Sequence, residues 1–237
     1  MVREYLYSSE EFKIEDSELG ISFLDSVNLP KVDHTLDCNK DLGNEFSYQV
    51  VKDPEDVITR SFTTKNDKID GSLVFFFSNG KKKGQSHYKD GKLHGPSYFY
   101  SEEGLVISES WYIHGLQQGR SKQNYIGGEL YASLQFLDGK QEGQQEYFYE
   151  NGQQKTLTFF KKGVLEGKSL LFFENGVVFR EMTYENGVRC GIEILRSEDG
   201  AIKEETDHEA LKKEAEQKLK EKEAKLKEEQ EKATPTS

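Results

Sequence analysis

Residues 147–167 have the sequence YFYENGQQKTLTFFKKGVLEG, and this order of aromatic, turn and glycine positions recurs every 24 residues. A second copy occupies residues 98–119, YFYSEEGLVISESWYIHGLQQG. Three sets of glycines keep the 24-residue step without insertion or deletion: Gly71, Gly95, Gly119, Gly143, Gly167 and Gly191; Gly80, Gly104, Gly128, Gly152, Gly176 and Gly200; Gly91, Gly115, Gly139, Gly163 and Gly187. An uninterrupted period of this length indicates a repeat protein in which each unit packs on its neighbours.

The residues beside these glycines predict tight turns. Asn-Gly and Asp-Gly pairs supply the positive φ that a two-residue hairpin turn requires. Such pairs stand at the first turn of several repeats, namely Asn79-Gly80, Asn151-Gly152, Asn175-Gly176 and Asp199-Gly200, and at the second turn, namely Asp90-Gly91, Asp138-Gly139 and Asn186-Gly187. Each repeat is therefore predicted to contain two short strands and two turns.

One position in every complete repeat is aromatic. The residues there are Tyr88, Tyr112, Phe136, Phe160 and Tyr184. Because side chains at alternate positions of a strand share a face, we expect this column to lie on one face of a sheet and to pack across the strands. An alternative is that part of the column is exposed and binds a partner.

Trp111 is the single tryptophan of the chain and lies one residue away from that column. Other repeats carry His87, Gln135, Phe159 or Thr183 at its position. We expect Trp111 to be exposed on the opposite face, and tryptophan is enriched at the energetic centres of interfaces. Trp111 is therefore a candidate partner-binding residue, together with the five residues of the aromatic column.

The chain divides into three segments. Residues 1–46 carry 4 basic and 11 acidic residues, and either cap the array or stay partly disordered. Residues 47–202 form the repeat array, with residues 47–70 as a degenerate first repeat, as is common at the end of an array. Residues 203–237 form a highly charged tail. In the repeat that starts at Gly119, polar residues 122–124 replace aromatic ones, which predicts a packing defect or a polar site.

The two quoted stretches resemble the variant MORN repeats of bacterial proteins, including the YwqK-type family. The resemblance covers residues 47–202. It implies an all-β fold, an elongated single-layer antiparallel meander of β-hairpins. It also implies a scaffold or binding surface, and an antitoxin-like protein that binds and neutralises another protein if the YwqK-type resemblance holds. Some eukaryotic members of the wider family associate with membranes.

Charge narrows the range of partners. The net charge of −11 disfavours nucleic acid, because phosphate contacts need a concentrated positive surface. It also disfavours an anionic membrane surface, which remains the alternative to a protein partner. The chain shows no secretory signal and no stretch of 18 apolar residues, and Cys38 and Cys190 are widely separated. These features predict a cytoplasmic protein with reduced thiols.

No motif predicts catalysis, a cofactor or a metal site. The five histidines are His34, His87, His94, His114 and His208, and none has a second ligand at metal-binding spacing. We expect solvent-facing or turn positions for them. The glycines are spaced for hairpins, and no phosphate-binding loop is present. The sequence therefore predicts a non-enzymatic protein without a cofactor.

The tail predicts a helix over residues 205–233, with Asp207 as its N-cap. Glu and Lys recur four residues apart, as in Glu214 and Lys218, and such pairs stabilise an isolated helix. The apolar stripe is too sparse for a coiled coil and consists of Leu211, Ala215, Leu219 and Leu226. We expect a solvated helix that projects from the end of the array as a solubilising tail, a spacer or a weak contact.

Overall fold

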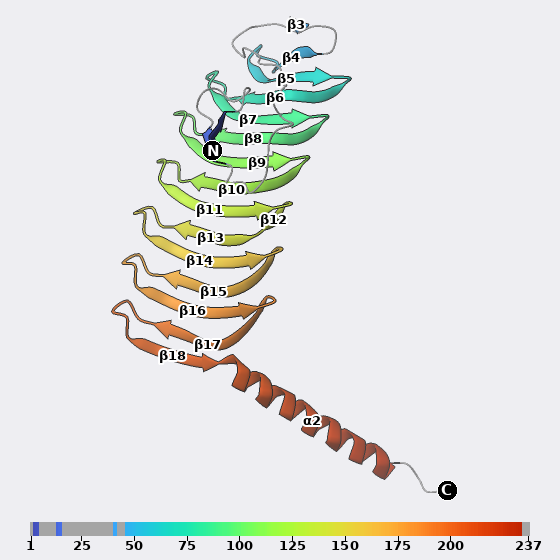
Figure 1. Ribbon diagram of the computed structural model, residues 1–237, viewed down its shortest axis with the longest axis vertical. Helices are drawn as coiled ribbons and strands as arrows, with labels where there is room; N and C mark the ends of the chain where they lie inside the picture. The colour runs from blue at the N-terminus through green and yellow to red at the C-terminus, as the bar shows by residue number, and fades with distance from the viewer. Residues whose placement is uncertain (1, 5–12, 16–39, 42–45, 234–237) are drawn as a thin grey trace.

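The computed structural model describes residues 2–4, 13–15, 40–41 and 46–233, with side chains described for residues 46–227. These residues form one long antiparallel sheet that ends in a helix, α2 (His208–Ala233) (Figure 1). The strands of the sheet are β3 (Lys40–Asp41), β4 (Ser47–Lys52), β5 (Ile58–Lys65), β6 (Lys68–Phe76), β7 (Lys82–Lys89), β8 (Lys92–Tyr100), β9 (Val106–Ile113), β10 (Leu116–Asn124), β11 (Leu130–Leu137), β12 (Lys140–Gln141), β13 (Gly143–Phe148), β14 (Gln154–Lys161), β15 (Val164–Phe172), β16 (Val178–Glu185), β17 (Val188–Arg196) and β18 (Ile202–Asp207). Two further strands, β1 (Val2–Glu4) and β2 (Lys13–Glu15), pair with each other.

The strand order of the sheet follows the order of the chain, so the fold is a meander. Each strand from β3 to β18 pairs with the next in antiparallel fashion, except that the short β12 pairs only with β11, which also pairs with β13. The predicted all-β repeat with one C-terminal helix is confirmed. Among the described residues the sheet has sixteen strands. Of these, β3 precedes the repeat array, and β12 and β13 together occupy the place of one repeat strand.

The first turn of each repeat is a three-residue loop. In the turn between β6 and β7, the Gly80 amide donates to the Phe77 carbonyl and the Phe77 amide donates to the Lys81 carbonyl, each at 2.9 Å. Gly80 has a φ of 80°, whereas Asn79 is not among the residues with positive φ. The predicted two-residue turn is therefore wrong at this place. Asn79 contributes through its side chain, which accepts a hydrogen bond from the Lys81 amide at 2.9 Å.

The second turn is the two-residue turn that the Asp-Gly pairs predict. Asp90 and Gly91 have φ values of 51° and 80°, which is the left-handed pair of a type I′ turn. The strands on either side end in the pair Lys89 and Lys92. The Gly91 amide also donates to the Ile69 carbonyl of the preceding hairpin at 2.8 Å. This turn therefore closes one hairpin and ties it to its neighbour.

A side chain reinforces that tie in every complete repeat. The Asp70 carboxylate accepts a hydrogen bond from the Asp90 amide at 3.0 Å, and Asp70 is only 4% exposed. The equivalent acceptors, each 20 residues before the amide they bind, are His94 with His114, Gln118 with Asp138, Glu142 with Lys162 and Glu166 with Asn186. Sequence reasoning missed this column because its members share the ability to accept a hydrogen bond, not a residue type.

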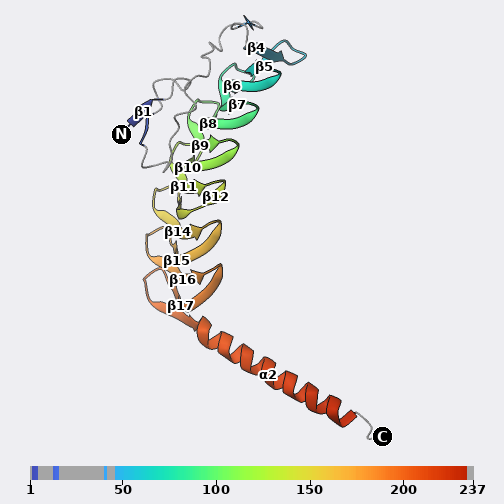
Figure 2. The ribbon, with the colours of Figure 1, turned by 45° about the vertical axis from the view of Figure 1, so that its right-hand side comes forward.

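The helix begins later than predicted. Residues 202–207 continue the sheet as β18, in register with β17 from Ile192 opposite Asp207 to Arg196 opposite Ile202. Asp207 is the N-cap, as predicted: its carboxylate accepts from the amides of Glu209 and Ala210 at 2.9 and 3.0 Å. Figure 2 shows α2 leaving the end of the array as a separate rod. Its three leucines, Leu211, Leu219 and Leu226, are 51–58% exposed.

The predictions for residues 1–46 fall almost entirely outside the described residues. The same holds for Cys38 and His34, whereas Cys190 is a free thiol. Two of the other histidines are not solvent-facing: His87 and His94 are 1% and 3% exposed. Nδ1 of His87 donates to the Pro96 carbonyl at 3.1 Å, and His94 belongs to the acceptor column described above. His114 lies in an exposed turn, as predicted.

Truncation of the chain after His208 is expected to change the melting temperature of the sheet by less than about 2 °C, because α2 packs little apolar surface on the strands. Truncation after residue 201 removes β18 as well, and should lower it markedly by exposing β17. Thermal unfolding followed by the fluorescence of Trp111, which is buried in β9 of the sheet, compares the two. Equal losses in both truncations would contradict a projecting helix.

Candidate interaction surface

The aromatic column defines one face of the sheet, called here the aromatic face. Every column residue lies directly opposite the first glycine of its repeat, as in Gly71 with Tyr88 and Gly143 with Phe160. A Cβ at Gly167 would meet no atom within 4 Å and one at Gly143 would meet the Gln135 side chain, so the positive φ of these positions, 81° and 73°, is what requires glycine. All five column residues are half-buried. The structure therefore supports packing across the strands while leaving part of each ring accessible.

A second row of large side chains runs parallel to the column on the same face. Phe99 lies opposite Gly84 and Ser108, and its ring would be 3.1 Å from a Cβ at Gly84. The row has the same 24-residue step and consists of Phe75, Phe99, Gln123, Tyr147, Leu171 and Leu195. Phe75 and Phe99 are 37% and 47% exposed. Sequence reasoning did not select this row, although its period was visible.

Small and mostly polar residues lie between the two rows. Ser86 and Ser97 share a hydrogen bond of 2.7 Å, and Ser110 and Ser121 share one of 2.9 Å. All four are at most 9% exposed. Large side chains on either side thus close over small ones in the middle, which lets a single sheet bury side chains without a second layer.

The aromatic face is uncharged over most of its length. The strand register places the following side chains on it between β6 and β15: Leu73, Phe75, Gly84, Ser86, Tyr88, Leu93, Ser97, Phe99, Ser108, Ser110, Tyr112, Gln117, Ser121, Gln123, Ala132, Leu134, Phe136, Gln141, Gln145, Tyr147, Thr156, Thr158, Phe160, Leu165, Ser169 and Leu171. None of them is Asp, Glu, Lys or Arg. Absence of charge combined with accessible aromatic rings is the composition of an interface core.

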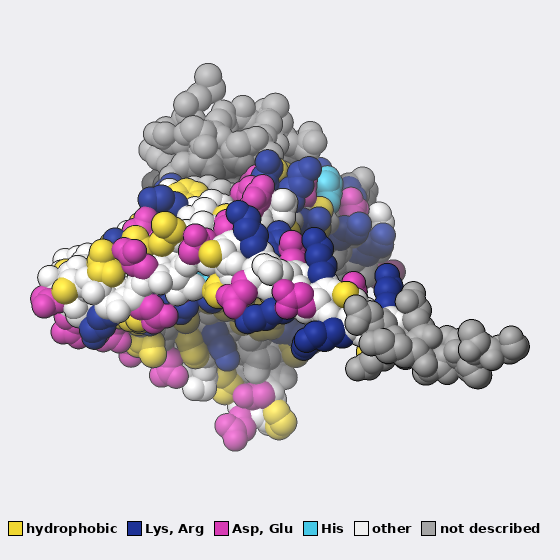
Figure 3. Space-filling model, turned by 90° about the horizontal axis from the view of Figure 1, so that it is seen from below, with side chains coloured by type: hydrophobic (Ala, Val, Ile, Leu, Met, Phe, Trp, Pro, Cys, Tyr) yellow, Lys and Arg dark blue, Asp and Glu magenta, His cyan; other side chains and the backbone are white. Residues whose placement is uncertain are grey.

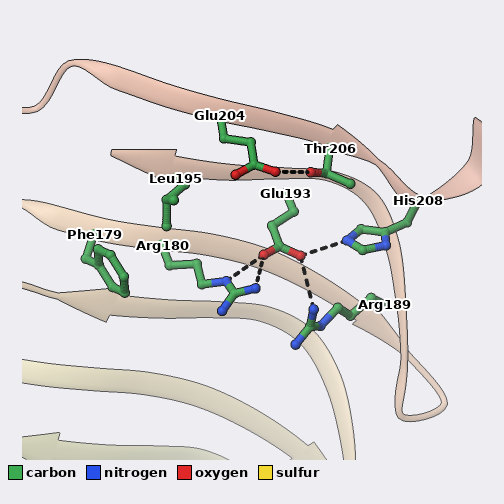
Figure 4. Close-up of a pocket in the computed structure, with 8 residues that line it drawn as sticks. All are labelled: Phe179, Arg180, Arg189, Glu193, Leu195, Glu204, Thr206 and His208. Atoms are coloured by element: carbon green, nitrogen blue, oxygen red, sulfur yellow. Dashed lines mark hydrogen bonds and ion pairs between the residues drawn. The ribbon is translucent and has the colours of Figure 1, made fainter. Parts of the chain in front are cut away.

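The face ends in a charged cluster at β16–β18 (Figure 4). The Glu193 carboxylate is 8% exposed and pairs with the Arg180 guanidinium through both Nε and Nη2. Its other oxygen lies 2.7 Å from Nε2 of His208 and 3.4 Å from Nη1 of Arg189. These residues line a hollow of about 360 Å³, together with Phe179, Leu195, Glu204 and Thr206.

Two opposing effects act on the pKa of Glu193. Burial favours the neutral acid and acts to raise this pKa, but hydrogen bonds from His208 and Arg180 and the charges of Arg180 and Arg189 outweigh it. The result is a pKa below the ordinary value of 4.5. Glu193 therefore stays ionised and holds the two arginines and the first residue of α2 in place.

This cluster interrupts three periodic columns at once. At the position of Arg180, earlier repeats carry Gly84, Ser108, Ala132 and Thr156. At the position of Glu193, they carry Ser97, Ser121, Gln145 and Ser169. At the position of His208, they carry aromatic residues. The coincidence of three breaks was the available sequence signal for these residues. Because no further hairpin follows, ion pairs replace aromatic packing at the end of the array.

Trp111 is the one predicted site residue that the structure places differently. It is 1% exposed, so the expected exposure is wrong. Trp111 does lie on the opposite face, across from Pro96 and Gln118. That face is closed in this part of the sheet, where Val74, His87 and Tyr98 are also at most 5% exposed. A partner contact by Trp111 stays a prediction, but exposure no longer supports it.

Comparison with known families agrees with the geometry. Three segments match the model of a MORN repeat variant, at residues 69–90, 141–162 and 165–186. They correspond to the hairpins β6–β7, β13–β14 and β15–β16, so the chain carries MORN repeats, which are generally protein- or membrane-interaction repeats. No curated protein matches the chain.

The described part of the chain contains no group of three or more His, Cys, Asp or Glu residues placed to hold a metal ion. Among the same residues, no helix has the length and apolar character needed to cross a membrane.

The substitution Glu193→Gln is expected to lower the melting temperature by about 4 °C or more at pH 7, because it leaves two arginines beside a buried amide. The pKa of Glu193 is lowered in the folded state, so its contribution is complete above the unfolded value of 4.5 and disappears as the pH falls through the lower folded value. Melting curves between pH 7 and pH 3 should therefore converge for the two proteins. Glu204→Gln, at an exposed carboxylate of the same hollow, serves as the control and should change little. A constant difference across the pH range would contradict this role of Glu193.

Proposed function

We propose that this protein is a non-catalytic interaction scaffold and that its aromatic face binds a protein partner. The observation that carries the proposal is the uncharged surface between β6 and β15, with two parallel rows of large, partly accessible side chains. The five column residues Tyr88, Tyr112, Phe136, Phe160 and Tyr184 form one row. Phe75 and Phe99 are the most exposed aromatic residues of the other.

The shape of the sheet supports binding rather than catalysis. Adjacent strands are about 4.8 Å apart, so the ten strands from β6 to β15 present a surface on the order of 40 Å long. Enzymes instead need titratable groups that converge on one substrate. Here the charged cluster around Glu193 lies at one end, and its members already satisfy one another. A long surface of this kind suits a polypeptide better than a small molecule.

A membrane surface is the second candidate, because MORN repeats also occur in membrane-associated proteins. The net charge of −11 opposes it for anionic lipids. The helix α2 has charged residues around most of its surface and lacks the broad apolar face of an interfacial helix. Charge therefore favours the protein partner.

A finer hypothesis follows from the resemblance to the YwqK-type family. On that hypothesis the partner is a toxic protein, and the scaffold neutralises it by covering its active surface. The length of the aromatic face is compatible with such a complex. Co-expression with the captured partner tests the idea: growth should be rescued by the intact chain and not by a variant of the aromatic face.

The double substitution Phe75→Ser and Phe99→Ser is expected to abolish capture of a specific partner, because it removes the two most accessible rings of the face. The matched control is Ile126→Ser with Leu219→Ser, which removes exposed apolar side chains from a turn and from α2. Quantitative mass spectrometry of proteins retained from a lysate compares the two variants with the intact chain. Thermal unfolding should show that each variant remains folded. Retention of the same proteins by the Phe75/Phe99 variant would contradict the proposal.

Flotation with vesicles separates the two partner classes. Vesicles containing about one-third phosphatidylserine should leave the protein in the unbound fraction at low and physiological salt, since the protein and the lipid surface are both negative. Neutral phosphatidylcholine vesicles serve as the control. Salt-sensitive binding to the anionic vesicles would favour a membrane role over a protein partner.

A further inference from the structure

We propose that the polypeptide bound by the aromatic face is apolar where it meets the sheet and basic along the side that meets one edge of the array. This inference rests on the proposed function and adds the chemistry of the partner. It comes from the charges of the two long edges between which the aromatic face lies.

The first turns of successive repeats form one of these edges, called here the first-turn rim (Figure 1). From the third hairpin of the array onward, the rim consists of residues 101–105, 125–129, 149–153, 173–177 and 197–201. These five turns contain no Lys or Arg and seven exposed carboxylates, which are Glu102, Glu103, Glu129, Glu150, Glu174, Glu198 and Asp199. Four of them, Glu102, Glu150, Glu174 and Glu198, occupy the same position of the repeat.

Neighbouring cations do not neutralise this rim. Lys81 donates to the backbone carbonyl of Glu102 at 2.8 Å, and Lys155 lies 5.3 Å from the ring of Tyr149. The charges of Lys81 and Lys203 act on Glu103 and Asp199 only as minor influences that lower the pKa. Among the described residues, no Lys or Arg forms an ion pair with any of the seven carboxylates. The rim therefore keeps its negative charge available to a partner.

The second turns form the other long edge, which is rich in lysine but also binds the carboxylates of Asp70, Glu142 and Glu166 through its amides. This second-turn rim consists of residues 65–68, 89–92, 113–116, 137–140, 161–164 and 185–188. It holds seven lysines, Lys65, Lys68, Lys89, Lys92, Lys140, Lys161 and Lys162, against four acidic residues, Asp67, Asp90, Asp138 and Glu185. Figure 3, which looks along the array from the α2 end, shows Asp and Glu side chains along the left edge, where the first turns lie.

An uncharged face between an acidic edge and a lysine-rich edge of mixed charge selects its ligand by charge complementarity. Apolar side chains of the partner would cover the aromatic rows, and its basic side chains would face the first-turn rim. The reverse orientation, or an acidic partner, would place like charges together along five turns. Successive first turns are two strands apart, so the five turns span on the order of 40 Å. The rim therefore fixes both the charge of the partner and the direction in which that charge faces.

The test uses the full chain and two synthetic peptides of about 20 residues, a length sufficient to span the rim when extended. Both peptides carry the same apolar residues, and the positions between them are lysine in one and glutamate in the other. Fluorescence anisotropy gives the dissociation constants. At about 50 mM salt the lysine peptide should bind at least about tenfold more tightly, and most of this advantage should be lost at about 300 mM.

The rim variant is Glu150→Lys, Glu174→Lys and Glu198→Lys, and it should reduce the affinity for the lysine peptide by about tenfold or more. Its control is Glu205→Lys, Glu216→Lys and Glu223→Lys, which makes the same change in net charge on exposed residues of β18 and α2. The control should keep the preference for the lysine peptide. Circular dichroism checks that both variants are folded.

The outcomes separate this inference from the proposed function. Equal binding of both peptides, weakened by Phe75→Ser with Phe99→Ser, would overturn the inference and leave the aromatic face as a binding surface. Loss of the preference in the control variant as well as in the rim variant would also overturn it, since net charge alone would then act. Binding of neither peptide, or binding that the Phe75 and Phe99 substitutions leave unchanged, would contradict both.

Discussion

The whole array depends on the tie between successive hairpins at the second turn. Two consecutive residues with positive φ, such as Asp90 and Gly91, reverse the direction of the chain, and their amides point toward the preceding hairpin. One amide donates to the Ile69 carbonyl and the other to the Asp70 carboxylate. Because these bonds join residues about 20 positions apart, an insertion anywhere between them would misplace the turn. This constraint explains why the 24-residue period runs without interruption.

A single sheet with this constraint must still bury apolar surface without a second layer. It does so within one face, where Phe99 covers Gly84 and small residues such as Ser86 and Ser97 lie between the two rows of large side chains. Such packing is shallow, so rings at the surface stay partly exposed. A stable fold and an accessible aromatic surface are thus consequences of the same arrangement, which is why packing and partner binding are not exclusive roles for these residues.

The period, the hairpins and the aromatic column were predictable because they depend on local rules: glycine at positive φ and alternation along a strand. The burial of Trp111 was not predictable, because alternation assigns a residue to a face but says nothing of whether that face is covered. The type of the first turn was also missed. Asn-Gly fits both a two-residue turn and a three-residue loop, and only the hydrogen bonds of Phe77 with Gly80 and Lys81 decide between them. The cluster around Glu193 combines residues from three strands and the start of α2, and a search for local motifs does not connect them.

Two sets of charged residues have different explanations. Arg180, Glu193 and His208 break the period where the array ends, and they satisfy one another, so their identity follows from the need to close the last hairpin. The edge strand β18 is similarly explained, since its exposed Lys203, Glu204 and Glu205 discourage pairing with another sheet. The four glutamates at the recurring position of the first-turn rim, Glu102, Glu150, Glu174 and Glu198, have no such structural reason. Their turns are closed by the backbone and by residues such as Gly152 and Asn151, and the side chain of Glu150 contributes to neither. A charge of one sign that recurs at solvent-facing positions, where the fold accepts any polar residue, points to a requirement outside the chain.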